Sequence, residues 1–229
     1  MNRSSPIPTS PPSASMAQGK IIDLSLDIFD RAPTYTGLPE CSVEIKPHPV
    51  SGDHLNTGKL TLNLHGTTHL DAPFHLFDKG GNGRAARTRP VHRSSPRHKP
   101  RAQKNREAIL VTELEPYVGI IVSGSRILLR TDWGRAFGKE TYFTDHPFLS
   151  LEAAAWFASK EISLLGLDFP TPNPKDVIEV HRILLGAGIV IVEALAHLHQ
   201  LPEKEFFFMA APIRIVGGDG APVRALAIV

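Results

Sequence analysis

Three histidines and one aspartate fall within eleven residues of this chain, in the run HGTTHLDAPFH. They are His65, His69, Asp71 and His75. Imidazole nitrogens and carboxylate oxygens bind Zn²⁺, Mn²⁺ or Fe²⁺ where no thiolate is present. The cluster therefore predicts a metal site. Composition leaves a second interpretation, a chance group of surface histidines, because the chain holds 11 His.

Two later residues have side chains of the same types. His181 falls on a helix expected over residues 175–185, and Glu193 ends a strand expected over residues 189–192. Each also has an ordinary structural interpretation. A single helix His is more often a surface or core residue than a ligand, and a Glu that ends a strand is often an edge residue.

The elements that would position these side chains follow from hydrophobic period and from breaker residues. Residues 65–75 leave a strand expected over residues 59–64 and are expected to form a loop. A helix is predicted over residues 149–160, with Ser150 as its N-cap. Further strands are expected over residues 21–27, 41–50, 127–131, 162–167, 206–216 and 223–229. Many strands with two or three helices indicate an α/β (mixed α+β) fold.

The length of 229 residues, with 41% hydrophobic and 21% charged residues, is typical of one globular domain. We expect residues 1–18, which are rich in Ser and Pro, to be a disordered tail, and residues 19–229 to form a single domain. A start codon assigned too early, with Met16 as the true start, would also explain the tail.

The basic character of the chain belongs to one stretch. Residues 84–106 contain nine Lys or Arg and no Asp or Glu, so the net charge of the rest is 2 − 9 = −7. A nucleic-acid-binding protein that uses this stretch is an alternative from another class. The stretch has no interleaved aromatic residues, so we expect a solvated loop and no nucleic-acid partner.

Cysteine content and hydropathy bear on the compartment. Cys41 is the single cysteine, which excludes an internal disulfide and fits a reducing environment. No apolar run approaches the length of a membrane span, and the N-terminus lacks the apolar region of a signal peptide. We therefore expect a cytoplasmic protein with no membrane partner.

The quoted run resembles the H-x-G-T-H-x-D-x-P-x-H motif of the cyclase family of metal-dependent hydrolases, which includes bacterial kynurenine formamidase and isatin hydrolase. The resemblance extends over nearly the whole chain after the tail. The segments IIDLSLDIFDRAPTYTG, HRILLGAGIVIVEALAHL and APIRIVGGDGAPVRALAI are similar to family segments. Thr67 stands where the motif has Gly, and the basic stretch 84–106 stands where the family has an apolar strand. Local divergence or a pair of compensating frameshifts would explain that stretch, which we expect to be disordered or poorly packed.

The resemblance implies a swivelling β/β/α domain, assembled as a homodimer or larger oligomer. It implies one or two divalent ions, first of all zinc, with manganese or iron as alternatives. It implies that Asp71 and Glu193 bridge two ions, that His75 is the catalytic histidine, and that Tyr35 lies against the substrate. The implied metal ligands are His65, His69, Asp71, His181 and Glu193.

The activity implied is hydrolysis of an amide-type C–N bond in a small molecule, with metal-activated water and a histidine acid/base. The first expectation is an arylformamidase that converts N-formylkynurenine to kynurenine and formate in tryptophan catabolism. Hydrolysis of a cyclic amide or lactone, as by isatin hydrolase, is the alternative with the same chemistry. A folded but inactive metal-binding relative is a third possibility.

Overall fold

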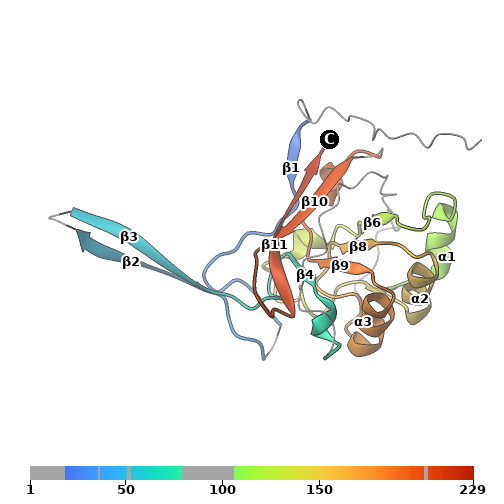
Figure 1. Cartoon of the computed structure of the whole chain (residues 1–229), viewed down its shortest axis with the longest axis horizontal. Helices are drawn as coiled ribbons and strands as arrows, with labels where there is room; N and C mark the ends of the chain where they lie inside the picture. The colour runs from blue at the N-terminus through green and yellow to red at the C-terminus, as the bar shows by residue number, and fades with distance from the viewer. Residues whose placement is uncertain (1–18, 36, 51–52, 79–105, 204–205) are drawn as a thin grey trace, which may run out of the picture.

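The computed structural model of the chain describes residues 19–35, 37–50, 53–78, 106–203 and 206–229. A body of sheet and helices carries a long hairpin arm that projects away from it (Figure 1). The strands are β1 (Ile21–Asp23), β2 (Ser42–Val50), β3 (Asp53–Thr61), β4 (His69–Asp71), β5 (Ala108–Ile109), β6 (Arg126–Leu129), β7 (Phe148–Leu149), β8 (Leu164–Leu167), β9 (Val190–Glu193), β10 (Phe207–Pro212) and β11 (Gly220–Ile228). The helices are α1 (Val111–Leu114), α2 (Leu151–Ser159) and α3 (Val177–Gly186), with 3₁₀ turns at Pro73–His75, Glu115–Tyr117, Trp133–Ala136 and Leu198–Gln200.

One seven-stranded sheet organises the body, in the order β1-β11-β4-β9-β8-β6, with β10 also paired to β11. The pairs β9-β8 and β8-β6 are parallel, whereas β4 lies antiparallel to both of its neighbours, β9 and β11. The short strand β4 therefore joins a parallel half to an antiparallel half. Two further sheets have two strands each, β2-β3 and β5-β7.

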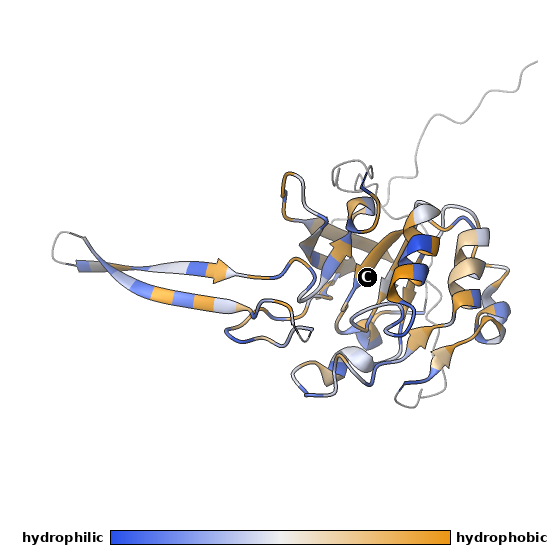
Figure 2. Cartoon of the chain, turned by 90° about the horizontal axis from the view of Figure 1, so that it is seen from below, coloured by the Kyte–Doolittle hydropathy of each residue, from blue (hydrophilic) through white to orange (hydrophobic). Residues whose placement is uncertain are grey.

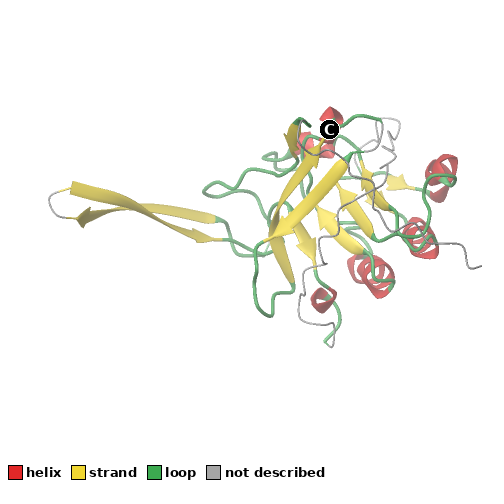
Figure 3. Cartoon of the chain, turned by 45° about the horizontal axis from the view of Figure 1, so that its top comes forward, coloured by secondary structure: helices red, strands yellow, loops and turns green. Residues whose placement is uncertain are grey.

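Helices cover one face of the large sheet (Figure 3). The core on that face includes Phe157 of α2, Leu184 of α3 and Ile191 of β9. Leu70 of β4 and Val192 of β9 belong to a second core on the opposite face. Neighbouring residues of β9 thus face opposite cores, as the period of two in a strand requires.

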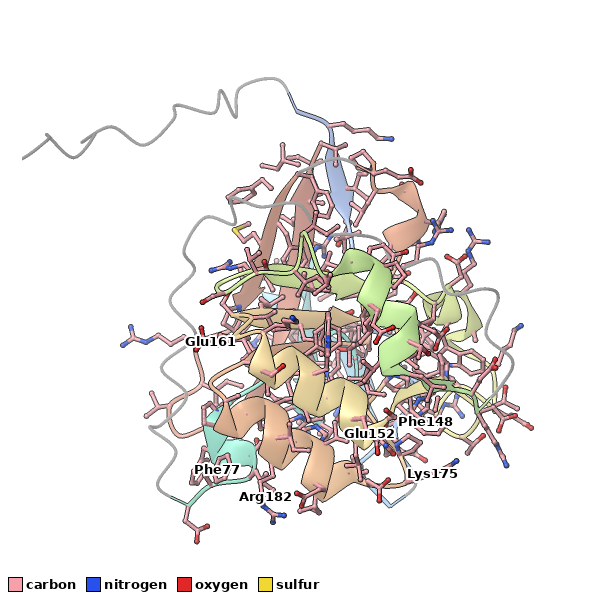
Figure 4. The ribbon with its side chains drawn as sticks, turned by 90° about the vertical axis from the view of Figure 1, so that its right-hand side faces the viewer. Phe77, Phe148, Glu152, Glu161, Lys175 and Arg182 are labelled. Carbon is pink, nitrogen blue, oxygen red and sulfur yellow. The ribbon has the colours of Figure 1, made fainter. Side chains whose placement is uncertain are left out.

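The helix α2 begins as the sequence predicts, because the Ser150 hydroxyl accepts a hydrogen bond from the Ala153 amide at 3.1 Å. The helices α2 and α3 lie side by side (Figure 4). Glu152 of α2 and Arg182 of α3 extend outward from this layer. The residues buried in α2 are Ala153, Ala154 and Phe157, and the partly buried Leu151 and Trp156 pack against the same core.

Several expected strand boundaries are also corrected. The first strand ends at Asp23 and does not reach residue 27, and the strand before the metal motif ends at Thr61, followed by turns over residues 64–65. The motif itself is not all loop, since His69–Asp71 is a sheet strand. The sequence did not predict this strand because two of its three residues are polar, and buried strands are normally predicted from runs of apolar side chains.

The expected tail at 1–18 lies outside the described residues, and so does the basic stretch except for Arg106. Arg106 forms an ion pair with Asp145 at 2.7 Å. Within the described part of the chain, no helix is long and apolar enough to cross a membrane.

Candidate metal centre

The sheet register places three of the candidate ligands on one face. His69 and Asp71 are two residues apart on β4, so their side chains point to the same side. Glu193 ends β9 and is the direct partner of His69 in the β4-β9 ladder. Directly opposed residues of an antiparallel pair have neighbouring side chains. His181 completes the group from α3, which covers this face of the sheet.

The four side chains form a ring in which imidazoles and carboxylates alternate. The His69 Nε2 atom lies 3.4 Å from Asp71 Oδ1 and 3.4 Å from Glu193 Oε2. The His181 Nε2 atom lies 3.4 Å from the other oxygens, Asp71 Oδ2 and Glu193 Oε1. Neighbouring ligands placed tetrahedrally about 2.0–2.1 Å from a zinc ion are about 3.3–3.4 Å apart, so each of these nitrogen–oxygen distances matches the spacing of two ligands of one cation.

Backbone carbonyls fix the tautomer of both imidazoles. The Nδ1–H of His69 donates to the Thr67 carbonyl at 2.7 Å, and that of His181 donates to the Val177 carbonyl at 2.7 Å. A neutral imidazole that donates from Nδ1 presents the Nε2 lone pair to the ring. Both histidines are therefore oriented as metal ligands are.

The burial and the charge of the ring indicate that it suits a cation. The buried atoms His69 Nε2, Asp71 Oδ2 and Glu193 Oε1 have no hydrogen-bond partner among the described residues. Buried polar atoms are normally satisfied, so a ligand is expected between them. Burial lowers the pKa of His69 and of His181, but Asp71 and Glu193 outweigh it and raise both pKa values to about 10. The negative charge that would attract two protons would equally hold a divalent cation.

A second, more open group adjoins the ring. Asp219, in the turn before β11, lies with its Oδ2 atom 3.1 Å from His65 Nε2 and 3.4 Å from His75 Nδ1. The other nitrogen of His65, Nδ1, lies 2.9 Å from Asp71 Oδ1. Ligand atoms of His65, Asp71 and His75 lie within 4.8 Å of one another. Asp71 therefore belongs to both candidate groups, whereas Glu193 belongs to the inner one.

Close backbone approach holds His65 in place. A Cβ atom on Gly220 would lie 2.6 Å from His65 Cε1 and 2.8 Å from the Leu70 carbonyl oxygen, so no larger residue fits here. The Thr68 hydroxyl donates to the Ala194 carbonyl at 2.6 Å and accepts from the Leu26 amide at 2.8 Å. These bonds join the motif to the end of β9 and to the segment after β1.

Tyr35 lies beside the centre. Its ring packs on Phe143 with the centroids 4.5 Å apart, and its hydroxyl is buried. Burial first, and then the charge of Glu193, raise the pKa of the Tyr35 hydroxyl well above its ordinary value, so the group stays protonated. His146 is fully buried nearby, and burial lowers its pKa despite the charge of Glu193.

All residues proposed from the sequence lie in or beside this centre. His69, Asp71, His181 and Glu193 form the inner ring, and His65 and His75 form the outer group with Asp219. Sequence reasoning missed Asp219, which offered no signal beyond its Gly-Gly-Asp-Gly turn. Neither Gly66 nor Thr67 has a positive φ, so the Thr at the motif's Gly position has no left-handed backbone to strain.

Comparison with known proteins places the fold and the family. The Cyclase family model ("Putative cyclase") matches residues 22–174, which is 153 of the 229 residues. Isatin hydrolase A from Ralstonia solanacearum superposes with a TM-score of 0.79 at 23% identity, covering 98% of this chain and 100% of that one. An isatin hydrolase bound to the product analogue thioisatinate gives a TM-score of 0.76 at 22% identity, covering 92% of each chain. The mixed α/β fold expected from the sequence is confirmed by these likenesses.

Curated relatives cover the same span. Kynurenine formamidase of Bacillus mycoides is 32% identical, and that of Bacillus cereus strain ATCC 10987 is 33% identical. In both cases the match covers 92% of this chain and 98% of the relative. Because the family model spans about two thirds of the sequence and these relatives span nearly all of it, the chain belongs to the cyclase family.

Proposed function

We propose that this chain is a metal-dependent arylformamidase, which hydrolyses N-formylkynurenine to kynurenine and formate. The observation that carries the proposal is the buried ring of His69, Asp71, His181 and Glu193 beside the partly exposed His75. The similarity to kynurenine formamidases over nearly the whole chain supports the substrate class.

The ring would hold a divalent cation, which we propose to be zinc, with manganese or iron as alternatives. Nitrogen and carboxylate ligands without thiolate suit all three. A cation held there would lower the pKa of water from about 15.7 to about 7 and polarise the substrate carbonyl. Asp71 and Glu193 neutralise its charge. Because Asp71 also contacts His65, these two residues would hold a second ion if one binds.

His75 is the proposed acid/base. Amide hydrolysis releases an amine whose nitrogen must take up a proton, and an imidazole can carry one at neutral pH. Burial lowers the pKa of His75 from 6.5; the charge of Asp71 raises it and that of His65 lowers it further. The His75 imidazole is therefore neutral and able to accept a proton. The Asp219 carboxylate 3.4 Å from His75 Nδ1 orients the ring and favours its protonated form.

Tyr35 is the proposed substrate contact. Its ring and that of Phe143 form an aromatic surface near the metal ring. Stacked or edge-on aromatic contacts suit the aryl part of a formanilide substrate. We also propose a cytoplasmic location, which the single cysteine, Cys41, supports because it is free and buried. The proposed role in tryptophan catabolism follows from the proposed substrate, N-formylkynurenine.

Hydrolysis of N-formylkynurenine should be measured with the protein as purified, after chelation, and after zinc or manganese is restored. We expect chelation to abolish activity and metal to restore it, with metal content determined in each sample. Isatin is the second substrate in the panel. A metal-loaded, folded protein that hydrolyses isatin but not N-formylkynurenine would replace the arylformamidase proposal with the cyclic-amide alternative.

A further inference from the structure

One nitrogen of His146 is buried without a partner, in the loop before β7. The Nδ1 atom lies 2.7 Å from the Pro147 carbonyl oxygen, which can only accept, so Nδ1–H is the donor. Burial lowers the pKa of His146, and its neutral ring therefore carries a lone pair on Nε2. Among the described residues, this Nε2 atom has no hydrogen-bond partner. His146 is thus oriented as His69 and His181 are, each by a backbone carbonyl at 2.7 Å.

The ring of His146 lies beside the end of β9. It stacks on the ring of Phe169, with centroids 6.0 Å apart and planes inclined by 16°. The Phe169 carbonyl accepts a hydrogen bond from the Ala194 amide at 3.1 Å, which fixes Phe169 next to the residue that follows Glu193. The charge of Glu193 reaches the His146 ring, although burial has the larger effect on its pKa. His146 therefore lies on the Glu193 side of the candidate metal centre.

The hydroxyl of Tyr142 is a second buried polar group without a partner among the described residues. Burial is the main cause that raises the pKa of Tyr142 well above its ordinary value, followed by the charges of Asp168 and Glu193, so the hydroxyl stays a donor. The strands of the body are largely hydrophobic (Figure 2). Unpaired polar atoms buried in such surroundings cost free energy, which a polar ligand would recover.

The partner that suits His146 Nε2 is a hydrogen-bond donor. In the described part of the chain, ligand atoms within 4.8 Å of one another form two groups, and neither includes His146. The nitrogen is therefore not placed to share an ion with the ring. A neutral imidazole nitrogen without hydrogen can only accept a hydrogen bond. The N–H of a secondary amide is such a donor, whereas the corresponding ester has an oxygen there and donates nothing.

We propose that His146 Nε2 accepts the N–H of an anilide substrate and so makes the centre selective for amides over esters and lactones. The inference rests on the proposed hydrolysis of an aryl amide. A site built to hydrogen-bond an N–H rejects the analogue that lacks it, because the buried acceptor is then left unpaired. A hydrogen bond through the N–H leaves the nitrogen lone pair of the leaving group free to take its proton from His75.

The first test measures binding and requires no turnover. Acetanilide and phenylacetone share an aryl group and a carbonyl, but phenylacetone has CH₂ in place of the N–H. We expect the metal-loaded wild type to bind acetanilide about 10- to 100-fold more tightly than phenylacetone. His146→Leu should lose this preference, and His146→Gln should restore part of it, because its side-chain oxygen accepts. His199→Leu, the same change at a half-buried histidine outside the centre, should keep the preference.

The second test measures turnover of formanilide and of phenyl formate, its ester counterpart. His146→Leu should lower kcat/KM for formanilide by about 10- to 100-fold and should change that for phenyl formate by less than about 3-fold. Metal content and Tm are measured on the same samples. An equal fall for both substrates would show a structural role and overturn the proposal. A wild type that binds acetanilide and phenylacetone equally, as it would if a fixed water occupied Nε2, would also overturn it.

The arylformamidase proposal and the His146 proposal fail in different ways. A metal-loaded wild type that does not hydrolyse N-formylkynurenine, but whose preference for acetanilide is lost in His146→Leu, would refute the arylformamidase and retain the N–H contact. Hydrolysis of N-formylkynurenine with the same kcat/KM in the wild type and in His146→Leu would retain the arylformamidase and refute the N–H contact.

Discussion

The inner ring and the outer group of the candidate centre use the same residue types in different surroundings. The side chains of His69, Asp71, His181 and Glu193 are 1–5% exposed, whereas those of His75 and Asp219 are 31% and 42% exposed. The inner histidines donate to backbone carbonyls. In the outer group, the Asp219 side chain contacts both His65 and His75.

The difference teaches which group suits which task. Backbone carbonyls hold the two histidines of the buried ring in one orientation. Cation binding requires ligands that are held in this way. A partly exposed histidine beside a carboxylate can exchange protons with substrate and solvent. The comparison thus supports the proposal that the inner ring stabilises charge and that the outer group transfers protons.

Removing the residue that both groups share should have the largest effect. We expect Asp71→Ala to lose bound metal and to lower kcat/KM by about 10³-fold or more, since both carbonyl polarisation and the activated water are lost. Metal analysis and steady-state kinetics on one preparation measure this. Asp78→Ala, the same change at an exposed residue of the same segment, is the matched control. An Asp71 variant with full activity would refute the ligand assignment.

Removing His75 from the outer group should separate metal binding from turnover. We predict that His75→Ala retains metal but loses about 10²- to 10⁴-fold in kcat, because the proton acceptor is gone while the inner ring is intact. Equal loss of metal and turnover would mean that His75 is needed for cation binding, and the contrast between the two groups would fail.

Removing the charge of Asp219, which contacts both outer histidines, should have an intermediate effect on kcat. Asp219→Asn keeps the shape of the side chain but removes its charge. We expect kcat to fall by about 10- to 100-fold with metal content unchanged, because orientation of His75 is weakened. If the fall is confined to KM, Asp219 acts on substrate binding and does not position the histidine.

The pH profile gives the smallest and most specific effect. Burial is the main cause that lowers the pKa of His75 from 6.5; His65 and His181 also lower it, and Asp71 and Asp219 raise it. Since we propose that neutral His75 is the active form, kcat/KM should fall on the acid side only below pH 6.5. Asp219→Asn removes a contribution that raises the pKa, so its acid limb should move to still lower pH. A limb that moves upward would contradict the assignment.

The sequence by itself determined the types of the candidate ligands, their spacing in the motif, the cap of α2 and the mixed α/β class. These features depend on local periodicity and on residue chemistry, which neighbouring residues in the chain suffice to define. Family resemblance brought His181 and Glu193 into the set, since nothing local distinguishes them from a helix surface and a strand end.

Only the tertiary structure decided that His69–Asp71 is a central sheet strand, that Glu193 is the ladder partner of His69, and that Asp219 joins the outer group. Each depends on pairing between segments far apart in the chain, and a run of polar residues does not reveal such pairing in advance. The exposure of Ile45 and Leu60 on the β2–β3 hairpin is likewise a tertiary fact. Alternation predicts a strand, but only the assembled fold shows that the body leaves these side chains uncovered.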